Sequence, residues 1–126
     1  GEFVARVVDG LNARGEESID AMWAIWHGIA DGPEAGPFTP PVSSVAVPDY
    51  RFVVARPMAL VNVRKKLERC EYRNLTAFAI EMNLIFQNAQ LYNSEEAPLF
   101  ATSVRLQNKL KAMCLTSFPD LPPETF

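Results

Sequence analysis

Hydrophobic side chains recur at intervals of three and four residues along most of the chain, which is the spacing of one face of an α-helix. Four segments show this pattern, over about residues 18–31, 60–70, 74–93 and 99–118. The residues along one side of each segment are, in chain order, Ile19, Met22, Trp23, Trp26 and Ile29; Leu60, Val63, Leu67 and Cys70; Leu75, Phe78, Met82, Phe86 and Ala89; and Leu99, Ser103, Leu106, Leu110 and Met113, all of them apolar except Ser103. The alternation typical of strands is absent from the sequence. The pattern predicts an all-α fold in which four amphipathic helices share their apolar faces in a four-helix bundle.

Residues that favour helix ends stand at the borders of these segments. Ser18 is predicted to cap the N-terminus of the first helix, which Gly32 and Pro33 end. Asn74 is predicted to cap the third helix, and Pro119 prevents much continuation of the fourth. The predicted divisions are an N-terminal extension over residues 1–15, of which residues 1–3 could be a cloning remnant, a folded domain over residues 16–118, and a C-terminal tail over residues 119–126.

Residues 31–56 do not fit a minimal bundle, because prolines interrupt any long helix there. The prolines are Pro33, Pro37, Pro40, Pro41 and Pro48. Loops of this length are uncommon in compact domains and are usually functional or disordered. This one carries apolar side chains that favour burial, namely Phe38, Val42, Val45, Val47, Tyr50 and Phe52. We expect the segment to fold against one end of the bundle, with a single helical turn near residues 48–53, either to form a site or merely to cap the core.

The apolar stripe of the third helix ends in a carboxamide, Asn93. A buried amide has two donors and two acceptor lone pairs, and leaving such a group unmet costs roughly 1 to 3 kcal/mol. One interpretation is that a ligand meets these groups. The other is that Asn93 only ends the helix by adopting the left-handed backbone conformation, which is a common C-terminal role for asparagine.

Composition agrees with one folded domain and narrows the classes of function. With 126 residues, of which 48% are hydrophobic, the chain can bury a single core. Its net charge of −3 gives no general attraction to nucleic acid, and the sequence has no run of about 18 apolar residues that could span a membrane. Cys70 and Cys114 are too few for a metal knuckle or a disulfide framework. We interpret both as small buried hydrophobic residues in a reducing compartment.

Five short segments together resemble a bromodomain, in their order and approximate spacing. They are Pro37-Phe38, Pro41-Val42, Pro48-Asp49-Tyr50, Arg56-Pro57-Met58 with Leu60, and the run from Phe86 to Asn93. The resemblance covers about residues 18–118. It implies a left-handed bundle of helices named Z, A, B and C, in which a long ZA loop (residues 31–56) and a short BC loop after Asn93 enclose a pocket for acetyl-lysine.

The resemblance also implies roles for individual residues. Asn93 is similar to the family asparagine whose amide donates to the acetyl carbonyl, and Tyr50 to the tyrosine that reaches the same oxygen through an ordered water. Leu99 is similar to the gatekeeper at the pocket entrance, although a shift of one residue would give that role to Phe100. The predicted acetyl-lysine-binding residues are Asn93, Tyr50, Phe38, Pro37, Val42, Val47, Ala89, Tyr92 and Leu99.

The implied function is that of a nuclear acetyl-lysine reader, not an enzyme, which binds acetylated histone tails or other acetylated proteins. No catalytic residue, metal or cofactor is expected, nor direct contact with nucleic acid or a membrane, and the chain is expected to be a monomeric domain of a larger protein. Two departures from the family pattern, suggestive of a protozoan bromodomain factor, are Gly36 in place of a tryptophan and Ala59 in place of an aspartate. They leave open an alternative, a degenerate bromodomain that serves as a protein-interaction scaffold without binding acetyl-lysine.

Overall fold

The computed structural model describes residues 18–43 and 45–126, and every regular element within those residues is a helix. Residues 18–30 form the first helix. The elements that follow are η1 (Gly36–Phe38), α2 (Tyr50–Val53), α3 (Leu60–Glu68), α4 (Leu75–Tyr92), α5 (Pro98–Ser117) and η2 (Pro123–Thr125). The predicted all-α fold is confirmed, as is the helical turn near residues 48–53. The predicted extension over residues 1–15 lies outside the described residues.

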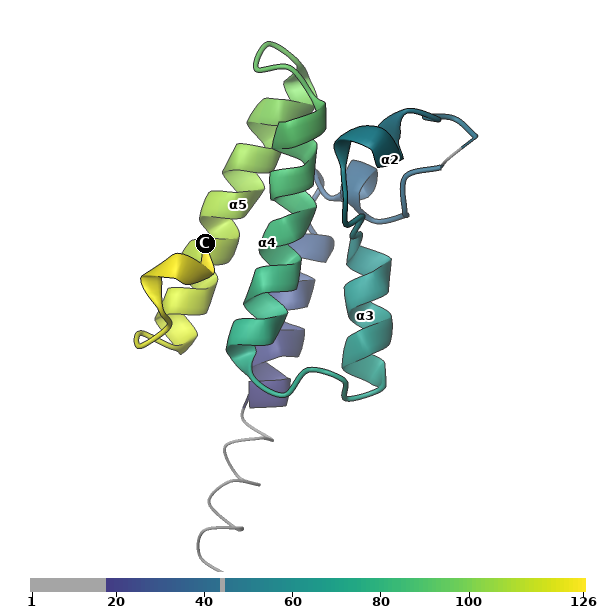
Figure 1. Ribbon diagram of the computed structural model, residues 1–126. Coiled ribbons are helices and arrows are strands. Elements are labelled where there is room, and N and C mark those ends of the chain that lie inside the picture. The colour runs from purple at the N-terminus through teal and green to yellow at the C-terminus, as the bar shows by residue number, and fades with distance from the viewer. Residues whose placement is uncertain (1–17, 44) are drawn as a thin grey trace, which may run out of the picture.

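Helix α4 forms the centre of the bundle (Figure 1), with α3 on one side, α5 on the other and the first helix behind. Its inward side chains Phe78, Met82 and Phe86 are completely buried. Leu60 of α3 and Leu110 of α5 are also completely buried and belong to the same core cluster. Burial of each such side chain contributes about 1.5 to 3 kcal/mol, so the shared apolar stripes are the main stabilising feature of the bundle.

Of the two N-caps predicted from the sequence, Asn74 is confirmed and Ser18 is not. The Asn74 side chain caps α4 as predicted, since its oxygen accepts a hydrogen bond from the Ala77 N–H at 2.8 Å. Ala59, at the corresponding position of α3, provides no side-chain hydrogen bond. The prediction for Ser18 is wrong, because Ser18 is already helical and is not an N-cap.

Cys70 differs from its prediction as a buried residue, while Cys114 is buried as expected. Helix α3 ends at Glu68, two residues earlier than the stripe suggested, and Cys70 has a φ of 55° in the left-handed region. Its N–H donates to Leu67 O, and the Glu71 N–H donates to Lys66 O, which together form a Schellman motif. The side chain of Cys70 therefore points to solvent instead of continuing the apolar face.

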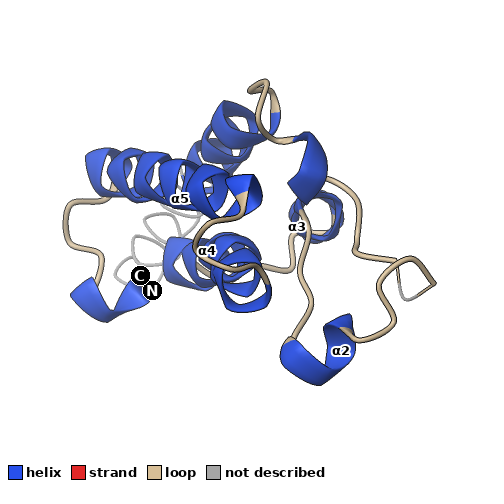
Figure 2. Cartoon of the chain, turned by 90° about the horizontal axis from the view of Figure 1, so that it is seen from above, coloured by secondary structure: helices blue, strands red, loops and turns tan. Residues whose placement is uncertain are grey.

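Hydrogen bonds join the ZA loop, drawn as the loop that carries α2 in Figure 2, to the bundle. The Val61 N–H donates to Thr39 O at 3.1 Å, and the Asn88 amide donates to Arg56 O at 2.8 Å. Only some of the apolar side chains of the loop are buried, however. Phe38 and Tyr50 are buried, whereas the expected burial of Val45 and Phe52 is wrong, since they are 90% and 91% exposed. Two positions separate Tyr50 from Phe52 on the short helix α2, so the two rings leave it in different directions.

The C-terminal residues 119–126 fold back along the bundle instead of leaving it (Figure 1). Leu121 and Phe126 pack against the core cluster, and η2 contacts α4. Thr125 is buried at this contact. The predicted tail thus covers one end of the core, the end opposite the ZA and BC loops.

Candidate functional site

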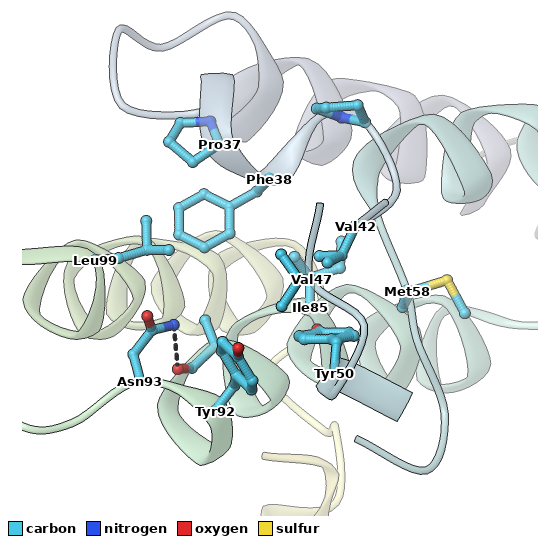
Figure 3. A pocket seen from close by; sticks show the side chains of 12 residues that line it. Pro37, Phe38, Val42, Val47, Tyr50, Met58, Ile85, Tyr92, Asn93 and Leu99 are labelled. Atoms are coloured by element: carbon cyan, nitrogen blue, oxygen red, sulfur yellow. Dashed lines mark hydrogen bonds between the residues drawn. The ribbon is translucent and has the colours of Figure 1, made fainter. Parts of the chain in front are cut away.

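A cavity of about 280 Å³ lies between the ZA loop, the C-terminal part of α4 and the start of α5 (Figure 3). All nine residues that the sequence nominated for the site line it. They are Asn93, Tyr50, Phe38, Pro37, Val42, Val47, Ala89, Tyr92 and Leu99. Leu99 borders the cavity, whereas its neighbour Phe100 is not among the lining residues.

Three further residues, Pro40, Met58 and Ile85, line the cavity and were missed in the sequence. Ile85 lies one helical turn before Ala89 on α4, so the period of the helix could have identified it. Met58 belongs to the Arg56-Pro57-Met58 segment that already supported the resemblance. Pro40 has no such signal, because its position depends on the path of an irregular loop.

The loop wall of the cavity depends on η1, which turns Phe38 inward. The Phe38 ring packs edge-to-face on the buried Phe86 ring, with centroids 5.4 Å apart and an interplanar angle of 72°. Thr39 Oγ1 donates to Ala35 O at 3.0 Å, which holds this turn closed. Pro37 precedes Phe38 at the exposed rim. This wall is therefore built on the hydrophobic core and is preorganised.

Two tyrosines join the ZA loop to the end of α4. The Tyr50 and Tyr92 rings are 5.1 Å apart at 61°, and the Tyr92 hydroxyl donates to Asp49 Oδ1 at 2.9 Å. That hydrogen bond raises the pKa of Tyr92, and burial raises the pKa of Tyr50. Both hydroxyls are neutral at physiological pH. The Tyr50 hydroxyl makes no hydrogen bond within the described part of the chain, so its bonding capacity is available at the cavity.

Asn93 is at the junction of α4 and the BC loop, residues 93–97. Its backbone has φ −91° and ψ 146°, so the left-handed cap is wrong and the residue is extended. Its Nδ2 donates to Ala89 O at 2.9 Å (Figure 3). Only the NH₂ end of the amide can donate to a carbonyl, so this bond fixes which end is nitrogen. The second N–H of Nδ2 and the Oδ1 atom have no partner among the described residues, and Asn93 lines the cavity.

A second polar cluster, the Glu81 cluster, consists of Arg56, Lys66, Tyr72 and Glu81 and was not predicted. Glu81 accepts hydrogen bonds from Lys66 Nζ and from the Tyr72 hydroxyl, each at 2.7 Å, and forms an ion pair with Arg56. Burial raises the pKa of Glu81, but the hydrogen bonds and the two positive charges outweigh it, so the net pKa is lowered. Every member has a partner within the cluster, so the cluster ties α3 and its flanking loops to α4.

His27 does not line the cavity. His27, the only histidine, is exposed, pairs with Asp31 at 3.0 Å and stacks on Trp23. Within residues 18–43 and 45–126, no group of three or more His, Cys, Asp or Glu side chains could hold a metal ion. No helix in that same part of the chain is both long and apolar enough to cross a membrane.

Comparisons with known proteins agree on one family. A family model described as Bromodomain matches residues 22–105. The chain is 33% identical over 91 residues to the ankyrin repeat, bromo and BTB domain-containing protein of Dictyostelium discoideum, covering 71% of this chain and 11% of that protein. It is 33% identical over 98 residues to Transcription factor GTE1 of Arabidopsis thaliana, covering 76% and 25% respectively. The chain therefore spans a quarter or less of these relatives. The solved bromodomain of human BAZ1A matches with a TM-score of 0.73 at 27% identity, over 77% of this chain and 91% of that one.

Proposed function

The chain belongs to the bromodomain family, and from this premise we propose that its cavity binds the side chain of an acetylated lysine. Bromodomains are binding modules and generally act as acetyl-lysine readers in chromatin proteins. The observation that carries the proposal is the Asn93 amide, which keeps one free N–H at an otherwise largely apolar cavity. In this proposal that N–H donates to the acetyl carbonyl, and the free Tyr50 hydroxyl acts on the same oxygen through water.

The chemistry of the cavity suits an acetylated side chain. Acetylation converts a hydrated ammonium into a neutral amide with one strong acceptor, one donor and a methyl group. Most lining residues are apolar, which favours the methyl group and the aliphatic chain, while Asn93 offers a donor for the carbonyl. The expected net contribution of that hydrogen bond is about 1 kcal/mol, so its main effect is on orientation.

Unmodified lysine should be rejected because no residue lining the cavity carries a carboxylate. Asp49, which precedes the lining residue Tyr50, already accepts the hydrogen bond of Tyr92. An ammonium group that entered would lose its water without gaining an anion, at a cost of several kcal/mol. Selectivity for the acetylated form therefore comes largely from exclusion of the charged form.

We infer the ligand to be an acetylated histone tail or another acetylated nuclear protein, bound by this domain as part of a longer protein. The relative named as a transcription factor supports a nuclear setting. A single mark on a short flexible peptide must be ordered when it binds, so we expect a dissociation constant in the micromolar range or weaker.

The test is isothermal titration calorimetry with an acetylated histone peptide and its unmodified twin. We expect only the acetylated peptide to bind, and Asn93→Ala to abolish the interaction. Asn74→Ala is the matched control, since it makes the same change at the other end of α4 and should leave affinity unchanged. Equal binding of both peptides, or an equal loss in both variants, would contradict the proposal.

The alternative function is a protein-interaction scaffold that does not bind acetyl-lysine, and the observation that favours it is Gly36, which leaves the position directly before the lining residue Pro37 without an aromatic side chain. Ala59 does not favour it, because this residue does not line the cavity and bears on the start of α3. A chemical-shift map in which varied acetylated peptides leave Tyr50 and Asn93 unmoved would support the scaffold.

A further inference from the structure

A single hydrogen bond connects the middle of the ZA loop to the bundle. In it the Tyr92 hydroxyl at the end of α4 donates to Asp49 Oδ1 at 2.9 Å. The loop has further hydrogen bonds to the bundle at Thr39 and at Arg56, but the described residues between these two positions make no other. Apolar burial also holds this segment, yet burial is non-directional, whereas a hydrogen bond weakens steeply when it is misaligned. The bond between Asp49 and Tyr92 is therefore the contact that fixes the orientation of α2 relative to α4.

This hydrogen bond joins the chain neighbours of the two polar residues of the cavity. Asp49 directly precedes Tyr50, and Tyr92 directly precedes Asn93. The rings of Tyr50 and Tyr92 also pack edge-to-face, with centroids 5.1 Å apart (Figure 3). A shift of α2 along α4 would therefore move the Tyr50 hydroxyl relative to the Asn93 amide.

The carboxylate of Asp49 does not serve the helix at whose start it stands. An aspartate at a helix N-cap usually accepts a hydrogen bond from a backbone N–H of the first turn. Asp49 is the N-cap residue of α2, yet its side chain makes no such bond. It accepts the Tyr92 hydroxyl instead, at an exposed position. Asp49 does not line the cavity, so its effect on a bound ligand is exerted through its neighbours.

We infer that Asp49 is a positioning residue for ligand binding and acts through Tyr50. By holding the Tyr92 hydroxyl, it keeps the Tyr50 hydroxyl where a water molecule can connect it to the acetyl carbonyl. This inference rests on the proposed function of the cavity. The role requires an acceptor oxygen at position 49 and not a negative charge, because the Tyr92 hydroxyl that it holds is neutral. Asparagine offers an acceptor oxygen at the same reach and should replace aspartate, whereas alanine should not.

The test is calorimetry with a glycine- and serine-rich peptide that has capped ends, a central acetyl-lysine and no charge, so that the charge of Asp49 does not attract it. Asp49→Ala should weaken binding about fivefold, the loss expected for one hydrogen bond, while Asp49→Asn should stay within about twofold of the unmodified chain. Tyr92→Phe removes the same bond from the α4 side, keeps the ring and should match Asp49→Ala. The control is Asp31→Ala, which removes another exposed, hydrogen-bonded carboxylate that does not line the cavity and should leave affinity unchanged.

A double substitution separates positioning from a general structural role. Tyr50→Phe alone should also weaken binding about fivefold, and adding Asp49→Ala should cause no further loss, because the hydroxyl through which Asp49 acts is already absent. If Asp49→Ala fails to fold, Tyr92→Phe takes its place in the same comparison.

Three results would overturn the inference and leave the proposed function intact. They are unchanged affinity in Asp49→Ala, a loss in Asp49→Asn as large as in Asp49→Ala, and a loss of about twenty-five-fold in the double variant, which is the product of two independent effects. If the unmodified chain binds no acetylated peptide, both the inference and the proposed function fail.

Discussion

Asn74 and Asn93 flank the same helix, but their side chains meet different surroundings. The Asn74 oxygen accepts the Ala77 N–H and completes the start of α4. The Asn93 nitrogen donates once, to Ala89 O, and the rest of its amide has no partner in the described part of the chain and faces a cavity. The same residue type thus completes the fold at one end of α4 and keeps unmet bonding capacity at the other.

The contrast extends to the neighbouring groups at each end. In the half of α4 nearest Asn74, Glu81 has partners on α3 and on the loops that flank it, and Tyr72 donates to it. Near Asn93, the Tyr50 hydroxyl has no protein partner among the described residues. Polar groups that hydrogen-bond to one another stabilise the bundle. Polar groups that border an apolar cavity without a protein partner are suited to binding a ligand. Substitutions at the two ends should therefore change different measured quantities.

Of the substitutions that compare the two ends of α4, Glu81→Leu should produce the largest loss of stability. It leaves Arg56 and Lys66 without their shared carboxylate, and because both cations retain some contact with water we expect a loss of about 2 kcal/mol instead of the 3 to 5 found for fully buried pairs. Urea unfolding measures the change, and Glu68→Leu, at an exposed ion pair, is a control that should stay within about 0.5 kcal/mol. An equal loss in both variants would contradict a structural role for the Glu81 cluster.

Acid should weaken the same end of the molecule. The pKa of Glu81 is lowered from its ordinary value of 4.5, so its contribution is fully present above that pH and is lost as the pH falls toward the folded-state pKa. We expect the free energy of unfolding to fall below about pH 4.5, and Glu81→Gln to make that decline shallower. Denaturant titrations at several pH values provide the measurement. A decline of unchanged slope in the variant would show that other carboxylates cause it.

Asn74→Ala should destabilise the chain by about 1 kcal/mol, because it removes the side-chain cap of α4. Asn93→Ala should cost less, since the backbone N–H of Asn93 still donates to Ala89 O after the side chain is removed. Thermal unfolding of the two variants compares the ends directly. A larger loss at Asn93 than at Asn74 would mean that the site asparagine also supports the fold.

Cys70→Gly should give the smallest effect, a gain of about 0.5 kcal/mol. Glycine adopts the left-handed conformation of Cys70 without a steric penalty, but it also increases the entropy of the unfolded chain, so most of the gain is offset. Chemical denaturation measures the difference, and Cys114→Gly, at a buried position, should be strongly destabilising in contrast. A loss of stability in Cys70→Gly would argue against strain at this turn.

The sequence predicted what depends on local spacing. Periodicity located the helices, and the order of short motifs nominated nine residues that all line one cavity. It could not predict the Glu81 cluster, because the partners come from separate parts of the chain and are brought together only by packing. Nor could it predict that Cys70 and Phe52 are exposed, since each depends on the local backbone and not on a repeating pattern.

The location of the two tryptophans determines what a simple optical measurement can report. Both are on the first helix, where Trp26 Nε1 donates to Leu60 O inside the core and Trp23 stacks on His27, and neither lines the cavity. Their fluorescence emission should therefore change when the bundle is denatured and stay almost constant when a peptide binds to the cavity. A tryptophan introduced at position 36 would add a fluorophore next to Pro37 at the cavity. The intrinsic fluorescence of that variant could then report when a peptide occupies the cavity.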